Sequence, residues 1–296
     1  MIEVFKHKTE KPSLGQIGYK TLKNKGIYHF IYVVFKFIFS KMDEAMLSHF
    51  PIYHGLRVSY YEYKTILTSD YDAPLNPYKI EWVDPDDINE FTRRNVRPVQ
   101  SCGLIKNGNW DRRDDYVYSE GYGKRYWHNR ARNGIYFEDS LFYQALKNHF
   151  DHGIDWKETE YFQAASKAFE IGEKISNGYT SEQELLLDFK RTDELYHEIK
   201  NNGYKTRADV NKWHDYDRGV MTFKKLKKSE ITVDIGRNGK LLFASSGKHR
   251  LAIAKILGLD EIPVIFICRH RNWMNHRDYI YRNELKVYHP DLSEFQ

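Results

Sequence analysis

Two short apolar runs separated by an Asn-Gly dipeptide constrain the fold of this 296-residue chain more than any other feature. EITVDIG (230–236) alternates like a strand, and LLFAS (241–245) has the composition of a second strand. Between them, Arg237-Asn238-Gly239-Lys240 fits a tight hairpin turn, because asparagine and glycine tolerate positive φ. The sequence therefore predicts a β-hairpin over residues 230–245.

A helix and a third strand are predicted to follow the hairpin. Ser246-Gly247-Lys248 reads as a tight turn, and apolar residues then recur at helical spacing from His249 to Leu257. Gly258 is suited to end this helix, and the apolar run from Glu261 to Cys268 is typical of a buried strand. This order makes residues 230–268 a strand–turn–helix unit with the turn at the beginning of a helix.

The turn at residues 245–250, SSGKHR, has the chemistry of a phosphate site. Backbone N–H groups at a helix N-terminus carry partial positive charge and attract anions. Gly247 allows the backbone to approach a ligand closely. Around it stand hydroxyl, amine, imidazole and guanidinium groups, contributed by Ser245, Ser246, Lys248, His249 and Arg250. We predict that this turn binds phosphate; the alternative is a solvated basic helix start that Ser246 caps.

The same segment, ITVDIGRNGKLLFASSGKHRLAIAKILGLDEIPVIFI, resembles the core of the ParB/sulfiredoxin superfamily, in which a hairpin leads through a G-x-[HR]-R turn into a helix and an IPV strand. IEWVDPDDI (80–88) resembles the opening strand of that core, and LYHEIKNNGYKT (195–206) the helix before the turn. The GLIKNGNWDRR segment resembles an archaeal branch. The resemblance implies an α+β fold with a small mixed sheet, and nucleotide phosphates bound by Gly247, Lys248, His249 and Arg250.

Departures from the superfamily narrow the function that the resemblance implies. Lys248 stands where sulfiredoxins have their catalytic cysteine, which excludes their redox chemistry. About 28 residues follow the core, too few for the helix-turn-helix DNA reader of ParB. Ser246 replaces the aspartate of the free-serine kinases, so a kinase of this type needs a base from elsewhere.

Phosphoryl transfer usually needs a carboxylate that accepts the proton of the attacking hydroxyl. Glu90 lies roughly where the kinase branch keeps its base, and Asp111 follows Trp110 in a polar segment. We predict Glu90, Asp111 and His249 as catalytic residues, although each acid, like Asp193 and Glu194, is otherwise an ordinary surface acid or cap.

The remainder is predicted to form a helical lead-in and an insertion. Residues 1–76 read as a basic, aromatic, mostly helical region, and residues 77–296 as the ParB/sulfiredoxin-like domain with an insertion at about 96–180. Within it, residues 96–136 are rich in Gly, Asn and Arg and read as a long ordered loop. Ser181 with Glu184 forms a capping box, which opens a helix that Asn202-Gly203 ends.

The net charge of +5 fits anionic ligands without requiring nucleic acid. The two cysteines lack zinc-site spacing, so no metal ligands are predicted.

Two further segments each allow more than one role. Ile27–Phe39 is too short to span a bilayer and suits either a membrane-surface helix or core packing. Residues 122–137 alternate basic and aromatic residues, which suits a nucleotide or nucleic acid as well as a solvated loop. The RHRNW run (269–273), with His276 and Arg277, is expected to add positive charge to the same cleft.

These patterns together favour a cytoplasmic nucleotide-binding phosphotransferase. The nucleotide is ATP or ADP, with CTP as a further choice, and Mg²⁺ accompanies it. The acceptor is a small polar molecule such as a sugar, a polyol or a lipid-linked group. The alternatives are a ParB-like nucleic-acid-binding nucleotide switch or nuclease, and a nucleotide sensor without turnover.

Overall fold

The computed structural model describes residues 27, 71–76, 79–94, 103–112, 136–175, 179–206, 230–293 and 295. The chain divides into two units, Met1–Leu56 and Arg57–Gln296, and every described residue except Ile27 belongs to the second. Most of the predicted region 1–76 lies outside the described residues, as does the Ile27–Phe39 segment beyond Ile27. Within the described chain, no helix combines the length and apolar character needed to cross a bilayer.

The second unit is an α+β fold built on a six-stranded mixed sheet, which confirms the predicted fold class at this level. The strand order is β1-β6-β4-β5-β2, and β3 also pairs with β6. β6 runs parallel to β3 and β4 and antiparallel to β1, while β5 is antiparallel to β4 and parallel to β2. The strands are β1 Ile80–Val83, β2 Glu90–Phe91, β3 Leu104–Lys106, β4 Ile231–Ile235, β5 Leu241–Phe243 and β6 Ile262–His270.

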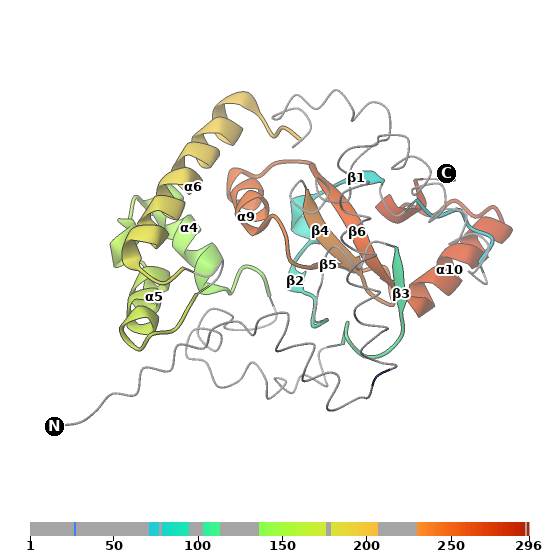
Figure 1. Cartoon of the computed structure of the whole chain (residues 1–296). Coiled ribbons are helices and arrows are strands. Elements are labelled where there is room, and N and C mark those ends of the chain that lie inside the picture. The colour runs from blue at the N-terminus through green and yellow to red at the C-terminus, as the bar shows by residue number, and fades with distance from the viewer. Residues whose placement is uncertain are drawn as a thin grey trace. The chain divides into compact units, whose positions relative to one another are not determined.

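Five α-helices accompany the sheet in the described residues. They are α4 Leu141–His152, α5 Glu160–Glu170, α6 Glu182–Asn202, α9 Lys248–Leu257 and α10 Arg271–Arg282. Short 3₁₀ turns lie at Pro85–Asp87, Trp156–Glu158 and Pro290–Leu292. In Figure 1, α9 lies directly beside the strands with α4, α5 and α6 grouped beyond it, whereas α10 lies at the opposite side of the view.

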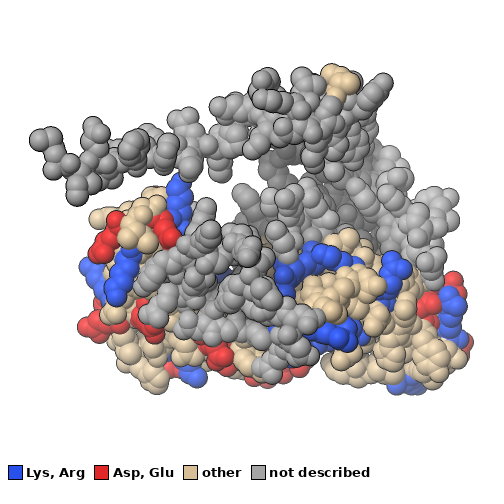
Figure 2. Space-filling view, turned by 90° about the horizontal axis from the view of Figure 1, so that it is seen from below, with Lys and Arg blue, Asp and Glu red and all other residues tan. Residues whose placement is uncertain are grey.

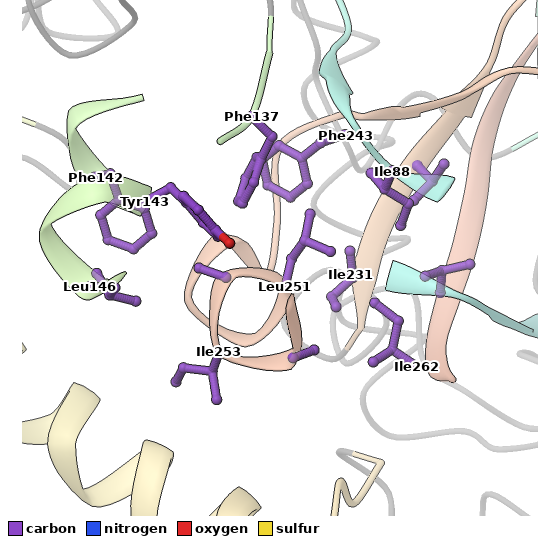
Figure 3. Close-up of a cluster of buried hydrophobic side chains, with 14 of the residues drawn as sticks. Ile88, Phe137, Phe142, Tyr143, Leu146, Ile231, Phe243, Leu251, Ile253 and Ile262 are labelled. Carbon is purple, nitrogen blue, oxygen red and sulfur yellow. The ribbon is translucent and has the colours of Figure 1, made fainter. Parts of the chain in front are cut away.

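Helix α9 is at the centre of the hydrophobic core. Its residues Leu251 to Ala254 are completely buried, because strands cover one side of the helix and α4 and α6 contact the other. Figure 3 shows Ile231 and Ile262 of the sheet on one side of Leu251, and Phe142 of α4 on the other. Burial of one such side chain contributes about 1.5–3 kcal/mol, so this core fixes the orientation of α9 and of the turn before it.

The predicted unit at residues 230–268 is confirmed element by element. β4 and β5 form the antiparallel hairpin, α9 ends at Gly258, and β6 extends to His270 before the chain enters α10. Gly239 in the hairpin turn has a φ of 82°, and a Cβ there would lie 2.7 Å from Trp273. Glycine at this position is therefore required by both conformation and packing.

The capping box before α6 is also confirmed, with the difference that the Glu184 carboxylate binds the N–H of Thr180, the residue before the N-cap. Ser181 Oγ accepts from the N–H of Glu184 at 3.3 Å, while the Glu184 carboxylate accepts from the N–H of Thr180 at 2.7 Å. Helix α6 ends at Gly203, as predicted.

The prediction of a loop over residues 96–136 is wrong for part of that range. Leu104–Lys106 form β3, which pairs in parallel with the last residues of β6. Three residues are too few to show a strand period, and the pairing depends on the partner strand rather than on local pattern. Residues 113–135, with most of the 122–137 segment, lie outside the described residues.

Candidate functional site

The turn at 245–250 connects β5 to α9, and Gly247 is the N-cap of the helix. Gly247 has a φ of 87°, and a Cβ there would lie 2.7 Å from Cγ1 of Ile231. Glycine is thus required first for close packing against β4. No side chain accepts a hydrogen bond at this cap, so Ser246 does not cap the helix as the alternative to phosphate binding supposed.

Thr232 of β4 holds the turn in place. Its Oγ1 accepts from the backbone N–H groups of Ser245 at 3.2 Å and Ser246 at 2.9 Å. Its own N–H donates to the carbonyl oxygen of Ser246. The two serines are exposed and half-buried respectively. The path of the backbone before α9 is therefore fixed by a residue that the sequence pattern did not single out.

Arg250 makes an internal ion pair. Its Nη1 donates to Oε2 of Glu230 at 2.9 Å and to the hydroxyl of Tyr204 at 3.3 Å. Glu230 is completely buried and Arg250 is 8% exposed. A phosphate held by Arg250 would have to share the guanidinium with Glu230, so Arg250 contributes less positive charge to the turn than its sequence position implied.

A carboxylate from α6 reaches the turn: Oδ2 of Asp188 lies 3.4 Å from Nε2 of His249. That nitrogen is buried and makes no hydrogen bond of ordinary geometry in the described structure. Burial lowers the pKa of His249, as does the charge of Lys248, against the opposing effect of Asp188. Burial acts to raise the pKa of Asp188, but His249, Tyr179 and Lys248 together lower it. The pair therefore favours an ionised aspartate beside a neutral imidazole.

Phe142 of α4 completes this cluster. The Lys248 Nζ lies 4.2 Å from the centroid of its ring, within range of a cation–π interaction. The His249 ring meets the same phenyl group edge-on, with centroids 4.8 Å apart. Residues from α4, α6 and α9 thus converge at the first turn of α9 and give it one amine, one imidazole and one carboxylate.

The predicted bases Glu90 and Asp111 do not lie at this turn. Glu90 pairs in register with Leu242 and binds Lys240 at 2.8 Å. Asp111 accepts from the backbone N–H and the guanidinium of Arg237, and these hydrogen bonds lower its pKa although burial opposes them. Both acids are at the hairpin end of β4 and β5, whereas the 245–250 turn follows the other end of β5. The structure brings His249 but neither of these acids to the predicted phosphate site.

The expected contribution of the RHRNW run is wrong for its buried arginines. Arg269 and Arg277 are 3% and 0% exposed, and both pair with Asp291. The indole N–H of Trp273 donates to the same carboxylate at 2.8 Å. Both guanidinium groups are buried and share the Asp291 carboxylate, so these two charges do not face a cleft.

The two histidines with lowered pKa values predict a specific pH dependence of stability. Burial lowers the pKa of His249 and of His289, whose Nε2 lies 2.8 Å from the Gly239 carbonyl oxygen. Well above a pH of about 6.5, both imidazoles are neutral in the folded and in the unfolded chain, so neither lowers the unfolding free energy. As the pH falls below about 6.5 the unfolded chain takes up protons first, and each histidine lowers the unfolding free energy by at most about 1.4 kcal/mol per pH unit.

Urea unfolding at several pH values between 7.5 and 5 measures this slope. The double variant His249→Gln/His289→Gln should show a flatter profile than the wild-type chain, whatever its absolute stability. An equal slope in both proteins would contradict the assignment of neutral, buried imidazoles.

Compared with known proteins, the chain matches no family model, no curated protein and no solved structure, so the ParB/sulfiredoxin resemblance stays a prediction.

Proposed function

We propose that the 245–250 turn binds the phosphate groups of a nucleotide and that the chain transfers a phosphoryl group to a small polar acceptor. Asp188 takes the place of Glu90 and Asp111 as the base in this proposal. The observation that carries it is the meeting of a helix N-terminus without a side-chain cap and the Asp188–His249 pair at one point of the fold.

Phosphate binding is supported by the electrostatics of the first turn of α9. The helix dipole places partial positive charge there, and a capping side chain would have occupied the same position. Lys248 adds the positive charge of its amine. Arg250 is paired with Glu230 and the pKa of His249 is lowered, so Lys248 is the main cation of this turn.

Asp188 suits the base because it is ionised near neutral pH. A carboxylate with a lowered pKa is a weak base, and its role is to orient the attacking hydroxyl and accept the proton late in the transfer. A neutral His249 can accept or donate a hydrogen bond beside it without adding charge. The kinase reading therefore assigns Asp188 to the acceptor hydroxyl and the α9 N-terminus to the phosphates.

Magnesium would accompany the nucleotide rather than occupy a site made by the protein alone. The described residues contain no group of three His, Cys, Asp or Glu side chains placed for a metal ion. The nucleotide phosphates and water can supply the oxygen ligands that Mg²⁺ commonly requires.

Two substitutions test binding and transfer separately. Lys248→Gln should weaken nucleotide binding about tenfold, since it removes one charge-assisted contact of about 1.5 kcal/mol. Asp188→Asn should retain binding and lower the rate of transfer by roughly 10²–10⁴-fold. Calorimetry with ATP, ADP and CTP measures the first, and labelled ATP with a pool of small polar acceptors measures the second.

Glu194→Gln is the matched control, because Glu194 is an exposed acid on the same helix. It should change neither binding nor transfer. If none of the three nucleotides binds the wild-type chain, the proposal fails. If a nucleotide binds and is only hydrolysed, the nucleotide switch replaces the kinase.

A further inference from the structure

A separate cluster of positive charge lies at the hairpin end of the sheet. Strands β3, β4 and β6 run parallel, so their carboxyl ends meet there together with the β4–β5 turn. This end carries the exposed side chains of Lys106, Arg112, Lys240 and Arg271, which we call the strand-end basic surface.

Fixed contacts of the fold bring these residues together. Lys106 pairs in register with His270, the last residue of β6, and Arg271 follows directly as the first residue of α10. The Arg237 guanidinium donates to Asp111 and to the Gly108 carbonyl oxygen, which fastens the loop after β3 to the hairpin. Arg112 follows Asp111 directly and is held beside the hairpin by the same contacts.

The acids at this end already have basic partners, so the surface has an excess of positive charge. The pairs are Asp111–Arg237, Glu90–Lys240 and Asp291–Arg269. Lys106, Arg112 and Arg271 form no ion pair with a carboxylate in the described part of the chain. Figure 2, seen from below Figure 1, shows Lys and Arg side chains gathered near the middle of the described surface with few acids between them.

The layout fits a chain of phosphates better than a single phosphate. Lys106 on β3 and Lys240 beside β5 are separated by three strand spacings, about 14 Å. Tyr136, which is 38% exposed, forms a bridge with Glu90 at the same end and offers an aromatic face for a base. The exposed residues between the cations include Asn107, Asn109 and Asn238, whereas membrane-binding surfaces insert apolar side chains.

We infer that the strand-end basic surface binds single-stranded nucleic acid, with backbone phosphates on Lys106, Arg112 and Arg271, with Lys240 shared between Glu90 and the phosphate chain, and with a base stacked on Tyr136. This binding site is independent of the proposed function of the 245–250 turn. Its affinity should fall steeply with salt, because phosphate contacts release counterions.

Fluorescence anisotropy with labelled single-stranded RNA and DNA, over a series of salt concentrations, tests the inference on the full chain. The variant Lys106→Glu/Arg112→Glu/Arg271→Glu should bind at least about tenfold more weakly, and its salt slope should fall by about 2–3. The control Lys147→Glu/Lys157→Glu/Lys167→Glu has the same net charge and replaces exposed lysines of the α4–α5 region. It should bind nearly as the wild-type chain does.

Three results would overturn the inference: no binding by the wild-type chain, equal losses in the two triple variants, or charge-dependent binding to phosphatidylserine vesicles without binding to either oligonucleotide. Nucleotide calorimetry on the strand-end variant separates this inference from the proposed function. Retained nucleotide affinity with lost oligonucleotide binding supports two distinct sites.

Discussion

Replacing Arg94 with alanine is expected to lower the free energy of unfolding by about 3–5 kcal/mol. Nε and Nη2 of Arg94 donate to the two carboxylate oxygens of Asp234 at 3.0 and 2.7 Å. The side chains are only 2% and 0% exposed. Removal of the guanidinium leaves the carboxylate of Asp234 inside the sheet without its charged partner, and burial already acts to raise its pKa. Urea denaturation of the variant measures the loss.

Two further variants distinguish the effect of an unpaired buried charge on stability from the effect of losing an ion pair in general. Lys205→Ala breaks the exposed pair with Glu198 and should leave stability unchanged within error. Arg94→Met combined with Asp234→Leu removes both charges and should recover most of the loss, because no charge is then left unpaired. If Arg94→Ala is as stable as Lys205→Ala, the pair contributes little to the fold.

This ion pair shows which part of the fold the sequence alone could not predict. Local patterns were enough for the β4–β5 hairpin, for α9 and for the capping box of α6, because each depends on neighbours a few residues away. Arg94 and Asp234 are 140 residues apart, and no local period connects them. Strands β2 and β3 have two and three residues, so only the longer strands beside them define their pairing.

The candidate site, like the fold, can be predicted from the sequence only where it depends on residues close together in the chain. The turn and its glycine follow from a local pattern, but the groups around it depend on how helices pack. Asp188 is three residues after Leu185 and four before Thr192, both buried, and this spacing places it at the border of the buried face of α6. The same spacing argument applies to several acids of the helix, and only the packing of α6 against α9 distinguishes Asp188 from them.

The resemblance points to Glu90, and the polar surroundings point to Asp111. Neither criterion shows that the two acids lie at the hairpin end of β5, whereas the 245–250 turn follows the other end of this strand. Likewise, the position of Arg250 in the turn and the resemblance predict it as a phosphate ligand, and the sequence does not show that Glu230, at the beginning of the same unit, is its partner. In the structure Glu230 directly precedes β4, whose residues are all buried, and Glu230 is completely buried as well.

Replacing Gly247 with alanine is expected to lower the free energy of unfolding by about 2–5 kcal/mol, the sum of left-handed strain and overpacking. The φ of 87° is unfavourable for alanine, and the new Cβ would lie 2.7 Å from Cγ1 and 3.0 Å from Cα of Ile231. Ile231 is completely buried, so it has no space to move into. The first turn of α9 must therefore shift away from β4, and Lys248 and His249 would move relative to Asp188.

Gly153→Ala is the matched control, because Gly153 has a φ of 69° and no atom lies within 4 Å of a Cβ at that position. It should cost only the strain, about 1–2 kcal/mol. The difference between the two variants in urea unfolding then measures the contact with Ile231. Nucleotide binding should weaken in Gly247→Ala and stay unchanged in Gly153→Ala under conditions where both are folded. Equal stability of the two variants would show that α9 tolerates displacement, and the close packing against β4 would not be what fixes the turn.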